Sequence, residues 1–257
     1  MSLLSAVLLG ITEGITEFLP ISSTGHLILA GRALGLPDTE FVKSFDIAIQ
    51  LGAIAAAVLV YGKMIIGTKK LWLTVAAAFI PTGIIGLLLH SFVKTYLLGN
   101  IAVVAGSLFI GGIILIVFEK FHRDESAQTL KAEDMTVPQA ILIGIAQALA
   151  IIPGISRSAA TVICGMAAGV RRSAIVDFSF LLAIPTMAAA TALDLLKTGD
   201  LLSSHDLAAL GVGFVVSFVT AYVVIRWLLS YIRTHTFAAF GVYRIALAAV
   251  VWIFMIR

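Results

Sequence analysis

Two polar stretches that resemble each other decide the fold: Gly10-Ile-Thr-Glu-Gly-Ile-Thr-Glu-Phe-Leu-Pro-Ile-Ser-Ser-Thr-Gly-His26 and Gly144-Ile-Ala-Gln-Ala-Leu-Ala-Ile-Ile-Pro-Gly-Ile-Ser-Arg-Ser-Ala-Ala-Thr161. Each has a helix-like arm, a proline, a turn rich in hydroxyl groups, and a second arm of small and apolar residues. Proline breaks a helix, and a break at membrane depth is tolerated where the loose backbone is buried in protein or lines a cavity. We therefore predict two re-entrant helix hairpins, at 2–35 and 137–169. One kinked spanning helix with a flanking loop is the alternative for each.

The composition is that of a protein embedded in a membrane. Hydrophobic residues make up 60% of the chain and charged residues 12%, and the mean hydropathy is +1.09. Soluble domains carry roughly 25% charged residues. A formal net charge of only +3, without a basic cluster among aromatic residues, argues against a nucleic-acid partner. We predict an all-α polytopic integral membrane protein in contact with membrane lipids.

Outside the hairpins, six apolar segments reach the roughly 20 residues that span a bilayer: 44–62, 71–90, 99–118, 174–196, 207–229 and 238–256. Pro20 and Pro153, one in each hairpin, are 133 positions apart. We predict a first repeat at 1–136, ending in a polar loop at 119–136, and a second repeat at 137–257, within one membrane domain. Because each repeat has one hairpin and three spans, the second is inverted relative to the first.

The distribution of Lys and Arg predicts the orientation, because these residues gather in cytoplasmic loops. One face carries ten of them and the other five, and the richer face holds the loops 63–70, 119–136, 170–173 and 226–237. With that face in the cytoplasm, both termini lie outside. Hairpin one then enters from outside and hairpin two from inside.

Two carboxylates lie on one face of the first arm, because Glu13 and Glu17 are one helical turn apart. Carboxylates this close repel each other unless a cation or a proton lies between them. Carboxylate and phosphate oxygens are typical ligands of Mg²⁺ or Ca²⁺. We expect Glu13 and Glu17 to bind such a cation, or one of them to act as a general base. A buried structural network is the alternative.

Hydroxyl groups and a histidine follow the first proline, in Ser22-Ser23-Thr24-Gly25-His26. Hydroxyls and backbone N–H groups at the start of a helix bind anions, phosphate above all. We expect Ser22, Thr24 and Gly25 to contact phosphate, although an ordinary helix cap is the alternative. Ser23 and His26 are placed for nucleophilic attack and for acid–base catalysis.

The second hairpin carries a cation in place of the carboxylates. Arg157 is costly near the centre of a bilayer, and its planar guanidinium suits a phosphate group. Ser156, Ser158 and Thr161 add hydroxyl groups to the expected phosphate site. The alternative for Arg157 is a structural ion pair with a carboxylate of Glu13, Glu17 or Asp177, and the two roles can alternate as substrate binds and leaves.

Other polar residues are expected around this site or elsewhere. Asp46, Gln50, Gln147 and Asp177 are expected to support the site from outside. Arg244 is expected to reach the membrane surface along its aliphatic stem or to pair within a helix bundle.

At these residues the chain resembles the undecaprenyl-diphosphate phosphatase family linked to bacitracin resistance. Glu-Gly-Ile-Thr-Glu-Phe-Leu-Pro-Ile-Ser-Ser-Thr-Gly-His is similar to the glutamate-rich motif of that family, and Pro-Gly-Ile-Ser-Arg-Ser-Ala-Ala-Thr to its second motif. The resemblance implies hydrolysis of a C55 polyprenyl diphosphate, which recycles a lipid carrier for peptidoglycan synthesis. It implies a divalent cation, a bacterial inner-membrane location and a site open to the periplasm. It also assigns Glu13 and Glu17 to the acidic motif, Ser23 as nucleophile, His26 to acid–base catalysis and Arg157 to phosphate binding.

A transporter or flippase for polyprenyl phosphate is the alternative function, because inverted repeats with broken helices are common in transporters. The Glu, Ser and His set favours hydrolysis, since transport does not need it. Whether Ser23 or water attacks, and whether the chain forms a homodimer, stays open.

Overall fold

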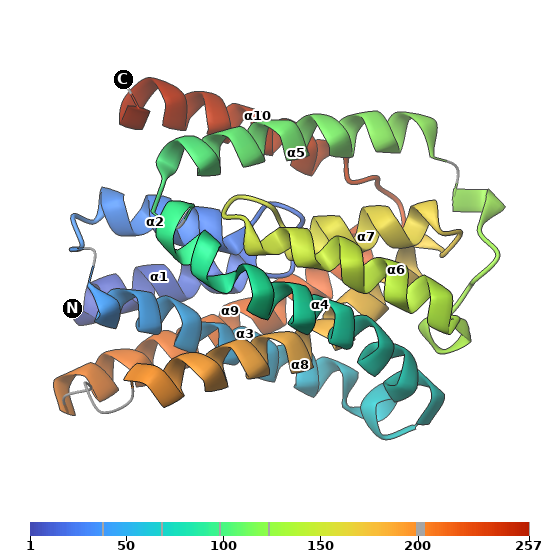
Figure 1. Cartoon of the computed structure of the whole chain (residues 1–257), viewed down its shortest axis with the longest axis horizontal. Helices are drawn as coiled ribbons and strands as arrows, with labels where there is room; N and C mark the ends of the chain where they lie inside the picture. Colours follow the sequence, from blue (N-terminus) through green and yellow to red (C-terminus); the bar gives the residue numbers. More distant parts are fainter. Residues whose placement is uncertain (38, 68, 98, 123, 199–203, 257) are drawn as a thin grey trace.

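The computed structural model describes the chain except residues 38, 68, 98, 123, 199–203 and 257. The predicted loop 119–136 and the basic residues counted for orientation therefore include positions outside the described residues, Arg123 and Arg257. Within the described part, the chain folds into helices joined by turns, with one isolated β-bridge between Thr129 and Val170. Figure 1 shows the long helices running roughly side by side, with both termini at the same end of the molecule.

Six helices of the described chain are long and apolar enough to cross a membrane, which confirms the predicted all-α polytopic fold. They are α3 (Glu40–Gly67), α4 (Lys69–Tyr96), α5 (Ile101–Phe121), α8 (Arg172–Thr198), α9 (Ser204–Tyr231) and α10 (Ala238–Val251), the last continued by a π-helical turn at Trp252–Ile256. Several helices start or end outside the predicted spans. Hydropathy marks the apolar centre of a helix, whereas helical hydrogen bonding continues into polar flanks such as Glu40 and Lys43.

Each polar stretch folds into two short helices joined by a turn. The first contains α1 (Leu3–Thr16) and α2 (Ser23–Ala33). The second contains α6 (Val137–Ala148), a 3₁₀ turn at Leu149–Ile151, and α7 (Arg157–Ala167). The two helices of each pair pack together. Figure 1 shows α1 and α2 at one end of the molecule and α6 and α7 at the other, with their turns near the middle.

Polar side chains fix where the hairpin helices begin. Ser22 and Ser156 are the N-caps of α2 and α7, and each accepts a hydrogen bond from the backbone N–H three residues later. Thr136 begins α6 in a capping box with Gln139. The residues expected to bind phosphate therefore also start the second arm of each hairpin.

Helices of one half of the chain pack on helices of the other half, and the two halves do so in the same pattern. Helix α1 packs on α9, the second span of the other half, and α6 packs on α4 in the same way. The first spans α3 and α8 pack together, as do the third spans α5 and α10. Gly10 and Gly144 allow the equivalent close contacts: a Cβ on Gly10 would lie 2.8 Å from the Gly213 carbonyl oxygen, and one on Gly144 would overlap the Ala78 carbonyl oxygen. Matching contacts of this kind are expected when two repeats are related by a two-fold axis.

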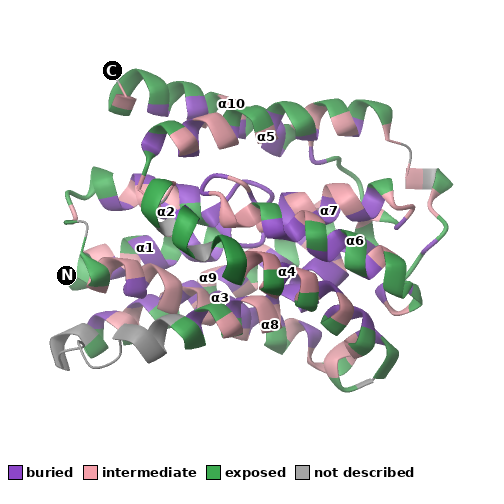
Figure 2. Ribbon diagram, viewed as in Figure 1, coloured by how far each residue is buried: buried purple, intermediate pink, exposed green. Residues whose placement is uncertain are grey.

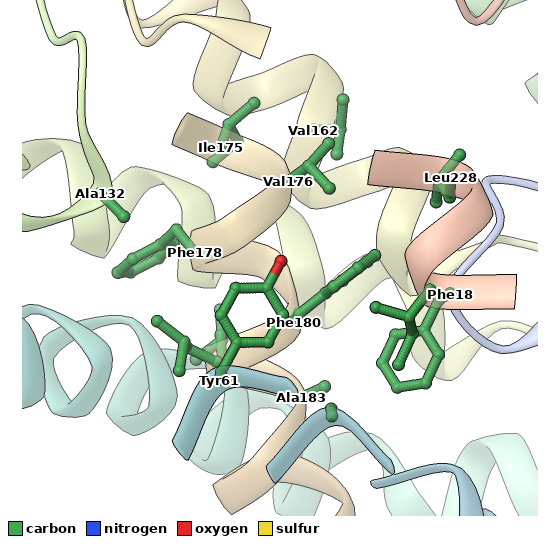
Figure 3. Close-up of a cluster of buried hydrophobic side chains, with 14 of the residues drawn as sticks. Phe18, Tyr61, Ala132, Val162, Ile175, Val176, Phe178, Phe180, Ala183 and Leu228 are labelled. Atoms are coloured by element: carbon green, nitrogen blue, oxygen red, sulfur yellow. The ribbon is translucent and has the colours of Figure 1, made fainter. Parts of the chain in front are cut away.

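A buried apolar cluster surrounds the first hairpin turn and joins it to the spans. Figure 3 shows Phe180 of α8 between Phe18 of that turn and Tyr61 of α3. The rings of Phe18 and Phe180 meet edge to face with centroids 4.7 Å apart. Figure 2 shows buried residues gathered at the centre and exposed ones on the outer helix faces. Large apolar side chains such as Leu88 and Val223 lie on those outer faces, where a membrane would cover them.

The polar loop between the halves contacts the start of α8, and a buried ion pair lies beside it. It contains 3₁₀ turns at Asp124–Ser126 and Ala132–Asp134. Arg172 at the start of α8 forms a buried ion pair with Glu119 near the end of α5, with 2.7 Å between nitrogen and oxygen. The other oxygen of Glu119 accepts a hydrogen bond from the backbone N–H of Phe237 at 2.9 Å.

Candidate active site

A polar cavity of about 260 Å³ is formed by both hairpin turns and by the spans beside them. Six of the residues expected at the site line it: Glu17, Ser22, Ser23, Thr24, Ser156 and Arg157. Gln50, Thr82, Gln147 and Thr186 add polar groups from α3, α4, α6 and α8. Residues more than 100 positions apart in sequence thus meet around one space, and that space can hold a small anion or a phosphate headgroup.

The carboxylate of Glu17 connects the two hairpins. One of its oxygens accepts a hydrogen bond from the Ser23 hydroxyl at 2.5 Å. Its other oxygen pairs with an Nη of Arg157 at 3.1 Å. The Glu17 and Arg157 side chains are only 3% and 11% exposed, so water screens this ion pair weakly. Glu17 is therefore positioned to accept the Ser23 proton, and Arg157 holds the carboxylate in place.

Arg157 keeps unused hydrogen-bonding capacity at the cavity. Its second Nη donates to the Ser179 carbonyl oxygen of α8 at 2.9 Å, which fixes the guanidinium plane. Its Nε is buried and has no hydrogen-bond partner. Since an unpaired donor on a buried cation is costly, this group favours an anionic ligand in the cavity.

The backbone at Ser22 is strained. Among the described residues, Ser22 is the one non-glycine residue with a positive φ, at 72°. L-residues pay roughly 1–2 kcal/mol for such a conformation. Strain of this kind is held by the surrounding structure and is often found at functional sites. This backbone conformation at Ser22 turns the chain into the start of α2, where the Ser23 hydroxyl donates to Glu17.

Three expected phosphate contacts lie behind the cavity wall. Ser158 donates to the Phe18 carbonyl oxygen at 3.0 Å, which ties the second hairpin to the first turn. Thr161 is hydrogen bonded to the Ser179 hydroxyl at 2.7 Å. Gly25 lies against the tip of the other hairpin, because its Cβ would be 3.6 Å from Gly154 Cα. In this structure Ser158 and Gly25 join the hairpins and Thr161 ties α7 to α8, whereas Ser156 both lines the cavity and contacts the Leu19 carbonyl oxygen at 3.4 Å.

The structure places His26 beside the other residues but not on the cavity lining. Its Nδ1 is 2.7 Å from the Ser22 carbonyl oxygen and its Nε2 is 2.8 Å from the Tyr243 hydroxyl. A carbonyl can only accept, so Nδ1 carries the proton and the Tyr243 hydroxyl donates to Nε2 in the neutral ring. Glu17, rather than His26, is the hydrogen-bond partner of Ser23.

Glu13 is fully buried one turn before Glu17, and neither of its oxygens has a hydrogen-bond partner. Its charged neighbours are the carboxylates of Glu17 and Asp46 and the Arg157 guanidinium. No described group of three or more His, Cys, Asp or Glu side chains has the arrangement of a metal site. The unpartnered Glu13 oxygens nevertheless fit a cation that takes its remaining ligands from Glu17 and from phosphate.

Two threonines at the cavity were missed by the sequence interpretation. Gln147 donates through one amide nitrogen to the hydroxyls of Thr82 and Thr186, at 3.2 Å each. Each threonine directly follows a proline within a span, Pro81 in α4 and Pro185 in α8. A Pro-Thr pair in the middle of an apolar helix, once in each half, is the signal that would have found them.

Comparison with known proteins identifies a family that includes both motifs. A family model described as "Bacitracin resistance protein BacA" matches residues 6–250. The chain belongs to this family. The match includes the whole of α2, α3 to α9 and both hairpin turns, so all the cavity residues named above fall inside it.

Proteins that are similar to this chain over nearly its whole length carry the name undecaprenyl-diphosphatase. The protein of Aquifex aeolicus is 48% identical over 245 residues, covering 95% of both chains. That of Thermus thermophilus is 46% identical and covers 98% of this chain and 97% of its own. That of Methanococcus aeolicus is 41% identical, and the two chains are covered completely.

Proposed function

We propose that this chain removes the terminal phosphate of undecaprenyl diphosphate and releases the lipid monophosphate and inorganic phosphate. The relatives bear the name of this activity across nearly their full lengths. The single structural observation that supports it is the Glu17 carboxylate, shared between the Ser23 hydroxyl and the Arg157 guanidinium at the cavity. The lipid tail stays in the bilayer while the diphosphate reaches this cavity. In the cell, hydrolysis recycles the lipid carrier for peptidoglycan synthesis and opposes bacitracin.

Binding of the diphosphate changes the partner of Arg157. The incoming phosphate offers more negative charge than one carboxylate, and a guanidinium binds phosphate through two parallel hydrogen bonds. Arg157 uses its free Nε and one Nη for this, while the Ser179 carbonyl holds its other Nη. The hydroxyls of Ser22, Thr24 and Ser156 and the N–H groups that begin α2 and α7 complete the phosphate site.

Glu17, released from Arg157, then accepts the Ser23 proton. The Ser23 oxygen attacks the terminal phosphorus, and the bond from that phosphorus to the bridging oxygen breaks, leaving the lipid monophosphate. Water then hydrolyses the phosphoserine and the hydroxyl regains its proton. In the alternative mechanism water is the nucleophile: Ser23 and Glu17 orient a water molecule that attacks the terminal phosphorus directly. In both cases positive charge from Arg157 stabilises the transferring phosphoryl group.

A divalent cation, Mg²⁺ or Ca²⁺, belongs to this proposal, with Glu13 and Glu17 as its protein ligands. The support is the pair of buried Glu13 oxygens without a partner. When bound, such a cation neutralises phosphate charge. The proposal also keeps the predicted orientation, with both termini and the open side of the cavity on the periplasmic side of the bacterial inner membrane. The excess of Lys and Arg on the opposite, predicted cytoplasmic face supports this orientation.

The assay is phosphate release by purified protein in detergent, with farnesyl diphosphate or undecaprenyl diphosphate and Mg²⁺ or Ca²⁺. Ser23→Ala is expected to lower the rate at least about tenfold, which is ~1.4 kcal/mol in barrier. Acid quenching during turnover should trap a phosphoenzyme if Ser23 is the nucleophile. Absence of phosphate release from protein of confirmed fold would refute the phosphatase assignment.

A flippase for polyprenyl phosphate is the second candidate, because the matching helix contacts between the halves and the paired broken helices are typical of transporters. Proteoliposomes loaded with a labelled prenyl phosphate distinguish the two. Transfer between leaflets that Ser23→Ala leaves unchanged would support transport as a separate activity.

A further inference from the structure

Arg244 of α10 is a buried cation that no carboxylate in the described chain neutralises. It is 1% exposed and makes four hydrogen bonds, all to backbone carbonyl oxygens. A charge at membrane depth is costly unless it is well solvated by protein. Of the two alternatives expected for Arg244, reaching the membrane surface is therefore wrong, and its partners lie within the helix bundle. It points inward, because four convergent carbonyl groups replace its water.

The carbonyl groups come from three different parts of the chain. One Nη donates to Pro20 in the turn of hairpin one at 3.1 Å. The other donates to Gly154 in the turn of hairpin two and to Ser107 of α5, both at 3.0 Å. Nε donates to Leu108, also in α5, at 3.4 Å. A single guanidinium thus joins both hairpin turns to a spanning helix.

The two turn carbonyls occupy equivalent places relative to the site. Pro20 lies three residues before Ser23, and Gly154 lies three residues before Arg157. These turn segments contain no regular helix that would satisfy their carbonyl groups. Without Arg244 both carbonyls would be buried and unpaired, which is unfavourable, and the turns would be free to shift.

Helix α5 is shaped to admit the guanidinium. A Cβ on Gly111 would overlap Nη2 and Cζ of Arg244. One on Gly112 would lie 3.2 Å from Arg244 Cβ and 2.7 Å from the Gly241 carbonyl oxygen. The space for the guanidinium therefore depends on glycine at positions 111 and 112 of α5. By contrast, a Cβ on Gly106 of the same helix would meet no atom within 4 Å.

We propose that Arg244 is a positioning residue for the phosphatase reaction, which holds the two hairpin turns at the separation that brings Ser23 and Glu17 to Arg157. It touches neither substrate nor the reacting atoms. Its planar fork is required, because four carbonyls in different directions need several fixed N–H groups, which the single ammonium of lysine does not provide. This inference rests on the proposed phosphatase activity.

The test compares Arg244→Lys, Arg244→Ala and Gly111→Ala with Gly106→Ala as the matched control on α5. The readouts are kcat and KM for farnesyl diphosphate in detergent, together with the thermal unfolding midpoint. A misplacement of catalytic groups lowers kcat more than it changes KM. We expect kcat to fall at least about tenfold in all three variants, with KM within about threefold of wild type, and Gly106→Ala to keep wild-type values.

Several outcomes overturn the proposal. Arg244→Lys with wild-type kcat would mean that only the charge matters. Variants that unfold at lower temperature yet keep kcat while folded would mean that Arg244 serves stability alone. If Arg244→Ala does not fold, Gly111→Ala decides, because it keeps the arginine and only displaces it; kcat within about twofold of wild type refutes positioning. Inactive wild-type protein would instead refute the proposed function.

Discussion

Glu17→Gln is the sharpest perturbation of this site, because it removes one charge and keeps the shape of the side chain. The ion pair with Arg157 has 3.1 Å between nitrogen and oxygen. At an effective dielectric of about 20, that separation corresponds to a gross attraction of about 5 kcal/mol. Breaking a buried pair typically costs about 3–5 kcal/mol, since the remaining charge stays buried. The amide oxygen can still accept a hydrogen bond, so we expect a loss of about 3 kcal/mol in unfolding free energy, at the lower end of that range.

Activity should fall further than stability alone explains. The amide introduced by Glu17→Gln cannot take the Ser23 proton, and proton transfer by a positioned group contributes about 10²–10⁴ in rate. We expect at least about a hundredfold loss of phosphate release per folded molecule. The assay combines phosphate release with an SDS titration of the detergent-solubilised protein, which measures the unfolding midpoint.

Glu119→Gln is the matched control. The Glu119 carboxylate is also 3% exposed and pairs with a buried arginine, Arg172, but near the loop end of α5 and outside the cavity lining. This variant should lose comparable stability and keep its activity. Inorganic pyrophosphate should raise the unfolding midpoint of Glu17→Gln more than that of wild type, because it supplies the missing negative charge beside Arg157. Equal losses of activity in the two variants, or activity of Glu17→Gln within about twofold of wild type, would refute the reasoning.

Three further predictions address other parts of the site. His26→Ala should lower kcat at least about tenfold, ~1.4 kcal/mol, because it removes the anchor on the strained Ser22 carbonyl; kinetics of the folded variant at wild-type level would exclude any catalytic or anchoring role. Chelation with EDTA should abolish phosphate release and Mg²⁺ or Ca²⁺ should restore it, with Glu13→Gln needing at least about tenfold more cation; full activity in EDTA contradicts this. Gly154→Ala and Gly169→Ala both introduce a side chain at a positive φ, of 91° and 80°, but only the former would place Cβ 2.7 Å from a backbone oxygen, so only Gly154→Ala should lose activity in the phosphate assay. Equal effects of the two glycine substitutions would point to backbone strain alone.

Much of the architecture could be predicted because the signals are local. Runs of apolar residues mark the six spans, and the proline after each polar arm marks the break that makes a hairpin. The sequence alone did not decide between a hairpin and a kinked spanning helix, since the two differ in tertiary contacts: in a hairpin the two arms pack on each other, as α1 does on α2 and α6 on α7, and the turns can meet. The structure gives those contacts: Gly25 of one hairpin lies against Gly154 of the other.

The pairing of the polar residues could be predicted only in part. Ion pairing of Arg157 with Glu17 was one of three alternatives, because a sequence shows which charges are buried but not which of them face each other. His26 was expected to act in acid–base catalysis, but the sequence does not show which groups its ring contacts. In the structure its two ring nitrogens contact the Ser22 carbonyl oxygen and the Tyr243 hydroxyl of α10. For Arg244 the sequence left two alternatives, and it could not decide between them because the partners in the hairpin turns lie 90 and 224 positions away.

By itself, the sequence determined that this protein is a helical membrane protein with two broken polar hairpins, and its motifs identified the BacA family. Hydropathy, proline and glycine act on the backbone around them, so their effects can be predicted along the chain. Only the tertiary structure decided that Glu17 joins Ser23 to Arg157 and that Arg244 holds both turns. Those contacts depend on how helices from both halves pack. Packing brings together residues that are far apart in the chain, and the sequence does not show which of them will be close in space.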